Sequence, residues 1–134
     1  MKLPDQIKLW GDTSFRGDCP SEALEQVTFV NRVRARFPDS YGLILLHPRN
    51  EGKRTKLQAM KEKAEGLATG APDLIIPARI PFLCELKRRD HTKSTISEKQ
   101  VAYLEAAQNA GAYVCIALGV DSAWNAFEHW KSTL

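Results

Sequence analysis

Apolar residues recur along the chain in two spacings, one typical of helices and one typical of short strands. From Ser21, a suitable N-cap, to Pro38, apolar residues at steps of three and four predict a single helix. The expected buried stripe of this helix is Val27, Val30, Val33 and Phe37. Residues 41–47 are almost continuously apolar, which favours a strand covered on both faces.

The remaining segments complete the pattern of an α/β fold, with a mixed β-sheet flanked by helices in a single domain. The expected elements are a helix at 56–65, strands at 74–76 and 81–87, a helix at 98–110, a strand at 112–118 and a helix at 122–131. A helix joins the strands 81–87 and 112–118, so we expect a parallel, right-handed crossover. Residues 1–20 show no clear period and are interpreted as an irregular N-terminal extension of a domain at 21–134.

Composition narrows the class of protein without choosing a function. The chain is 43% apolar and 26% charged, as is usual for a globular protein, and its net charge of +3 leans toward anionic partners. Its apolar runs have the length of strands, and the N-terminus lacks the apolar stretch of a signal peptide. The three cysteines lack zinc-site spacing, so a reducing, cytoplasmic compartment is expected, with Cys84 and Cys115 as small buried residues on strands.

Two acidic positions on neighbouring predicted strands suggest a metal site. Asp73 begins the strand 74–76, and Glu85 lies in the next strand, followed by Leu86 and Lys87. If the two strands form a hairpin, both carboxylates can reach one cation, and the period of two places Lys87 on the same face as Glu85. Mg²⁺ prefers oxygen ligands, so the expected ligands are Asp73, Glu85 and the backbone carbonyl of Leu86. Lys87 would orient or deprotonate a water molecule, or pair with a phosphate.

Further candidates lie on the two predicted helices nearest these strands. Glu22 and Gln26, four residues apart, share a helix face, and Glu22 could add a carboxylate to the metal site. Glu25 is the alternative carboxylate on this helix. Gln100 could hydrogen-bond a metal-bound water or a phosphate, with Tyr103 beside it, although a tyrosine here may equally serve packing.

A basic segment follows residue 47 and gives candidates for contact with DNA. A charged helix face is by default merely solvated, but beside a nuclease site it would bind phosphates without reading sequence. The expected DNA-binding residues are Gln26, Arg49, Asn50, Lys53, Arg54, Lys56, Arg88, Arg89 and Tyr103.

Simpler interpretations exist for each part of the motif. Pro72-Asp73 is a common turn pair, and Glu85-Leu86-Lys87 could be the solvent face of an edge strand. However, the apolar residues around Glu85 make its strand look buried, and a buried carboxylate needs a partner or a metal. The combination therefore favours a catalytic site.

These residues resemble the motif of the PD-(D/E)XK nuclease superfamily. The surrounding sequence is similar to the VRR-NUC family in its compact, stand-alone phage and bacterial form, from about Ser21 to Phe127. The similar segments are Ser21-Glu22-x-x-x-Gln26, His47-Pro48-Arg49-Asn50-Glu51-Gly52, Gly70-Ala71-Pro72-Asp73-Leu74 and Ser97-x-x-Gln100. One departure is Asn50-Glu51-Gly52, where the family often has Asn-Gly-Gly.

The resemblance implies a restriction-endonuclease-like sheet with an αβββαβ core and a Mg²⁺- or Mn²⁺-dependent DNA endonuclease. Small members are similar to Holliday-junction resolvases, which act on branched DNA as homodimers. We expect the protein to act in the cytoplasm, or in the host cytoplasm if a phage encodes it. We expect neither a membrane partner nor an organic cofactor. The alternative is a non-catalytic nucleic-acid-binding module on the same fold, and a weaker one is a nuclease acting on RNA or a single strand.

Overall fold

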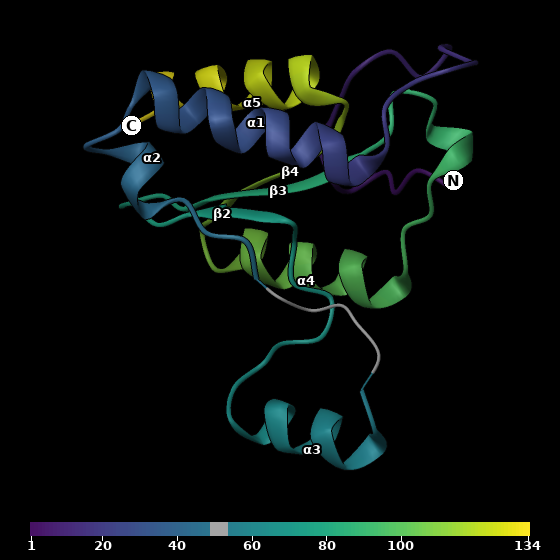
Figure 1. Cartoon of the computed structure of the whole chain (residues 1–134), viewed down its shortest axis with the longest axis vertical. Coiled ribbons are helices and arrows are strands. Elements are labelled where there is room, and N and C mark those ends of the chain that lie inside the picture. The colour runs from purple at the N-terminus through teal and green to yellow at the C-terminus, as the bar shows by residue number, and fades with distance from the viewer. Residues whose placement is uncertain (49–53) are drawn as a thin grey trace.

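The computed structural model describes residues 1–48 and 54–134, which form a mixed four-stranded sheet flanked by helices (Figure 1). The strand order is β1-β4-β3-β2, with β3 parallel to β4, β4 parallel to β1, and β2 antiparallel to β3. The strands are β1 (Leu9–Trp10), β2 (Leu74–Ile76), β3 (Phe82–Lys87) and β4 (Tyr113–Leu118). The α/β prediction is confirmed, as is the parallel pairing of the two central strands.

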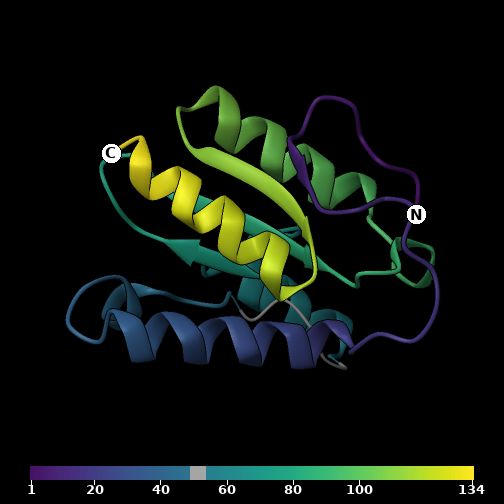
Figure 2. The ribbon, with the colours of Figure 1, turned by 90° about the horizontal axis from the view of Figure 1, so that it is seen from above.

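The helices form two layers, with α1 and α5 on one face of the sheet and α4 on the other (Figures 1 and 2). Side chains alternate across β3, so Phe82, Cys84 and Leu86 pack toward α1 and α5 while Leu83 packs toward α4. The helices are α1 (Glu22–Arg36), α2 (Tyr41–Ile44), α3 (Lys56–Ala64), α4 (Glu98–Asn109) and α5 (Val120–Ser132), with a short 3₁₀ helix, η1 (His91–Lys93).

The larger core cluster lies between the sheet and the layer of α1 and α5. Trp130 of α5 is fully buried, contacts the rings of Tyr41, Phe82 and Phe127, and donates its indole N–H to the carbonyl of Ile80 at 2.7 Å. Trp130 is therefore a core residue. The prediction that the strand cysteines 84 and 115 are buried is confirmed, and both are free thiols.

The predicted strand at 41–47 is wrong, because its first residues form α2. An apolar run of this length does not distinguish a buried strand from a buried helix. Glycine at position 42 lets α2 pack closely against the backbone of α1. Any other residue would place its Cβ only 2.6 Å from the Cα of Arg34 and from the carbonyl oxygen of Phe37. Only one bridge, between Leu46 and Ile75, extends the sheet edge at this point. The expected αβββαβ order therefore contains two strands, β2 and β3, between α1 and α4.

The assignment of residues 1–20 as wholly irregular is also wrong. Leu9 and Trp10 pair in parallel with β4, opposite Ile116 and Ala117. The preceding Ile7 is buried. This strand has two residues and a partner about a hundred positions away, so no local pattern in the sequence reveals it.

The buried side of α1 differs from the predicted stripe. Val33 is buried as expected. Val27, which was predicted to be buried, is 54% exposed, and Phe29 is buried in the core instead. Glu25 is buried as well, and one of its carboxylate oxygens accepts the backbone N–H of Val120. Val120 is the first residue of α5, and no side chain from Gly119 can cap this helix. Glu25 is thus the cap of α5, which explains a charged residue in the core.

Replacing Glu25 with alanine is expected to lower the free energy of unfolding by about 2 kcal/mol, because a buried helix N-terminus loses its acceptor. Chemical denaturation measures the change. Glu128→Ala is the control, since Glu128 makes only an exposed ion pair with Lys131 at 3.4 Å and should cost less than about 0.5 kcal/mol. Equal losses in the two variants would contradict the capping role.

Asp90 ties the N-terminal segment to the loop after β3. Its carboxylate accepts the hydroxyl and the backbone N–H of Thr92, and the backbone N–H of Gly17 at 3.0 Å. The Thr92 hydroxyl, followed by the Gly17 N–H, lowers the pKa of Asp90 to about 2. The ionised carboxylate therefore holds two segments that lie more than seventy residues apart.

This pKa shift predicts a specific loss of stability in acid. A carboxyl with a depressed pKa stabilises the fold above its ordinary pKa of 3.8, and this contribution disappears as the pH falls toward about 2. Thermal melts of Asp90→Asn should show a smaller fall in stability from pH 4 to pH 2 than melts of the wild type. Asp39→Asn, at an exposed position, should leave the acid profile unchanged. A wild-type profile in Asp90→Asn would refute this account.

Among residues 1–48 and 54–134, no helix has the length and apolar character needed to cross a bilayer. The helix α3 stands apart from the sheet (Figure 1) and has no buried residue.

Candidate active site

The antiparallel register of β2 and β3 sets the two motif carboxylates side by side. Leu74 pairs with Cys84, and continuing this register places Asp73 opposite Glu85. One carboxylate oxygen of Asp73 accepts the backbone N–H of Leu86 at 2.8 Å, which fixes its orientation. The predicted hairpin geometry is therefore present.

A cavity of about 280 Å³ opens over these residues. It combines side chains from α1, from the segment after α2, from the β2–β3 hairpin and from α4. The lining residues are Glu22, His47, Pro48, Ala71, Asp73, Glu85, Lys87 and Gln100. The structure thus brings together the five residues that the sequence nominated as catalytic.

Lys87 is buried, and its ammonium faces three oxygen acceptors. It donates to the backbone carbonyl of Thr95 at 2.6 Å and lies 3.4 Å from a carboxylate oxygen of Glu85. The third acceptor is a carboxylate oxygen of Glu22 at 3.5 Å. These three contacts fix the position of the Lys87 side chain beside Glu85.

Glu85 is almost completely buried, and its two oxygens differ in their surroundings. Oε1 accepts from the Gln100 amide at 3.1 Å, whereas Oε2 has no hydrogen-bond partner among the described residues. Burial, and then the charge of Asp73, raise the pKa of Glu85 to about 9, although Lys87 acts in the opposite direction. A hard divalent cation between the carboxylates would supply the missing partner and offset the cost of their charge, so the donor set fits Mg²⁺ or Mn²⁺.

Glu22 lines the cavity, and its role as a metal ligand stays a prediction. It faces the ammonium of Lys87 and accepts a long hydrogen bond, of 3.4 Å, from the hydroxyl of Ser94. Across residues 1–48 and 54–134, no three side chains of His, Cys, Asp or Glu converge as metal ligands. A cation would therefore rest on Asp73, Glu85, backbone carbonyl and non-protein oxygens. The alternative carboxylate, Glu25, points to α5 and does not line the cavity.

Gln100 is held by the start of its own helix. Its side-chain oxygen accepts the backbone N–H of Ser97 at 2.9 Å, completing a capping box, while its amide nitrogen donates to Glu85. The orientation of this amide is thus fixed from both ends. Tyr103 lies outside the cavity and packs into the core cluster beneath α4.

His47 lines the cavity, although it was not among the candidate site residues. Its Nδ1 lies 2.6 Å from the carbonyl oxygen of Asp73, and since a carbonyl only accepts, Nδ1 carries the proton. The available signal was its place in the His47-Pro48 segment of the similar motif. Thr95 also escaped notice, because it contributes a backbone carbonyl that no side-chain pattern reveals.

Most residues proposed to contact DNA lie away from the cavity. The guanidinium of Arg88 donates to the carbonyls of Cys19 and Pro20, and that of Arg89 lies 4.3 Å from the ring centre of Phe15. Both arginines therefore hold the N-terminal segment. Arg54 pairs with Glu62, Lys56 is exposed on α3, and Gln26 lines a neighbouring groove. The candidates Arg49, Asn50 and Lys53 lie outside the described residues.

This arrangement has a counterpart among solved structures. A chain described as "VRR_NUC domain protein" is similar with a TM-score of 0.67 and 20% sequence identity, over 86% of this chain and 89% of that chain. The fold is that of a VRR_NUC domain. No family model and no curated protein matches the sequence. This similarity of fold agrees with the family that the motifs resemble.

Proposed function

We propose that this protein is a metal-dependent endonuclease of the VRR-NUC type that hydrolyses phosphodiester bonds of DNA. The observation that supports this most is the environment of Glu85. Its buried carboxylate lies opposite Asp73, beside the ammonium of Lys87, and one oxygen lacks a partner. A structural ion pair would satisfy both oxygens, whereas a metal site leaves one directed at the ion.

Asp73, Glu85 and the carbonyl of Leu86 would hold Mg²⁺ or Mn²⁺. When bound, such an ion lowers the pKa of a coordinated water and neutralises charge that develops on the phosphoryl group. Lys87 would orient the attacking water or pair with a phosphate oxygen, which would replace one of its present carboxylate contacts. Glu22 and Gln100 would act as positioning residues, the first for Lys87 and the second for Glu85.

The finer parts of the proposal concern the substrate and the assembly. We propose branched DNA, such as a Holliday junction, as the substrate and a homodimer as the active form, since symmetric cuts at a four-way junction require two related sites. The net charge of +3 supports binding to the phosphate backbone, which carries no sequence information. The expected place of action is the cytoplasm.

The experiment compares labelled four-way junction, replication fork, nicked duplex and linear duplex in Mg²⁺, Mn²⁺ or EDTA. Metal-dependent paired cuts in the junction are expected. Cleavage of forks instead of junctions would support the metal-dependent chemistry but contradict the junction as the substrate. Asp73→Asn should abolish cleavage and retain binding, whereas the exposed-site control Asp39→Asn should cleave normally. Cleavage by Asp73→Asn would overturn the assignment, and binding without cleavage under every condition would favour a non-catalytic module.

A further inference from the structure

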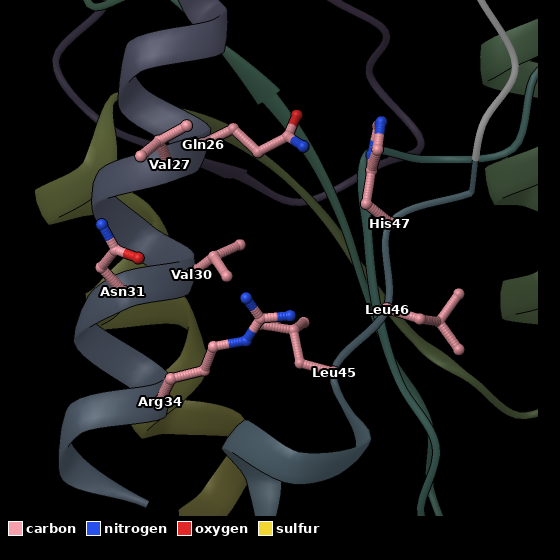
Figure 3. A pocket seen from close by; sticks show the side chains of 8 residues that line it. All are labelled: Gln26, Val27, Val30, Asn31, Arg34, Leu45, Leu46 and His47. Atoms are coloured by element: carbon pink, nitrogen blue, oxygen red, sulfur yellow. The ribbon is translucent and has the colours of Figure 1, made fainter. Parts of the chain in front are cut away.

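A second groove, of about 350 Å³, adjoins the candidate active site (Figure 3). The two spaces share one lining residue, His47. On one wall His47 lines both spaces, and on the other Glu22 lines the cavity while Gln26, one helical turn later, lines the groove. A strand whose phosphate lay at Asp73 and Glu85 could therefore extend directly into this groove.

The groove has an apolar centre with polar groups along α1. Figure 3 shows Gln26, Val30 and Arg34 extending from α1 toward the segment that carries Leu45 and His47. Val27, on the α1 wall, is 54% exposed, so apolar surface of this wall is open to a ligand. The complete lining is Gln26, Val27, Val30, Asn31, Arg34, Leu45, Leu46 and His47.

This combination matches an unpaired nucleotide better than a duplex. A duplex presents phosphates, sugars and base edges, and keeps the apolar faces of its bases stacked. An unpaired base exposes its face, which the valines and leucines can contact, and its edge, which the amides of Gln26 and Asn31 can hydrogen-bond. The guanidinium of Arg34 is suited to a phosphate further along the same strand.

We propose that this groove holds the base and sugar of one unpaired nucleotide next to the scissile phosphate. The inference rests on the proposed nuclease function and gives it a physical basis for selecting structured DNA. Extracting a base from a duplex costs free energy that a branch point or a single strand does not require. The enzyme would thus cut where a strand already leaves the duplex, without reading its sequence.

The test fills the groove and compares the result with a matched change outside it. Val27 and Leu24 lie on the same helix and are each 54% exposed, but only Val27 lines the groove. With the four-way junction in Mg²⁺, Val27→Trp is expected to cleave about 10- to 100-fold more slowly than the wild type, while Leu24→Trp stays within about twofold. Asn31→Ala serves as a second variant, with a smaller loss. Equal rates for the two tryptophan variants would overturn the inference while leaving the metal-dependent activity intact.

A binding measurement separates failure of the groove from failure of the catalytic assignment. In the Asp73→Asn background, forks carrying 2-aminopurine at successive positions around the branch point report unstacking as a rise in fluorescence. We expect the fluorescence to rise at one position, whether or not cleavage occurs. Adding Val27→Trp should abolish this rise, and adding Leu24→Trp should leave it unchanged. No rise at any position with the intact groove would overturn the inference.

Discussion

Replacing Glu85 with glutamine is expected to abolish metal-dependent DNA cleavage and to raise the melting temperature of the metal-free protein. Glutamine keeps the shape of the side chain and an oxygen that can accept from Gln100, but it removes the charge that would bind the ion. Loss of metal catalysis, worth several kcal/mol, corresponds to a cleavage rate about a thousandfold lower or more.

The gain in stability follows from the burial of Glu85. Its pKa rises from 4.5 to about 9 on folding, so the folded state retains a proton that the unfolded state loses as the pH rises through this interval. Stability should therefore fall between about pH 4.5 and pH 9 in the wild type, and less so in Glu85→Gln. Thermal melts in EDTA measure this difference. Glu98→Gln, on the exposed surface of α4, is the control and should change neither activity nor the pH profile. A less stable Glu85→Gln protein would contradict this view of the site.

Replacing Trp130 with alanine is expected to remove most of the stability of the fold. Loss of a buried tryptophan costs about 3–5 kcal/mol, and the carbonyl of Ile80 also loses its indole donor. Because domains are commonly stable by about 5–15 kcal/mol, the variant should be marginally folded at best. Urea denaturation and near-ultraviolet circular dichroism measure the effect.

Trp124 provides the comparison within the same helix. It is only half-buried, and the guanidinium groups of Arg32 and Arg36 lie over its ring at 5.3 and 5.8 Å. Trp124→Ala should therefore cost much less than Trp130→Ala. If the two costs were alike, the aromatic cluster around Trp130 would not be the main source of stability.

The hairpin that carries the candidate site was predictable because local rules determine it. The six residues of β3 form a buried strand, and the short connection from β2 makes the two strands pair antiparallel. The period of two then places Glu85 and Lys87 on the same face of β3. Gln100 was predictable for a similar reason, since Ser97 marks the start of α4.

Other features depend on partners distant in sequence. β1 exists only because β4 accepts it, and Glu25 is buried only because the N-terminus of α5 lies above it. The helix at Tyr41–Ile44 depends on backbone contact at Gly42, which an apolar pattern does not encode. The environment of Lys87 likewise needs the carbonyl of Thr95, whose position follows from the path of a loop.

The amide of Gln100 links the buried carboxylate of Glu85 to a backbone proton outside the cavity. Its oxygen accepts the N–H of Ser97 and its nitrogen donates to Glu85, so a change at Glu85 is transmitted to the exposed first turn of α4. The chemical shift of the Ser97 amide should therefore be a spectroscopic reporter of the ionic state of Glu85. Ion loading could then be followed by NMR without nucleic acid and without turnover.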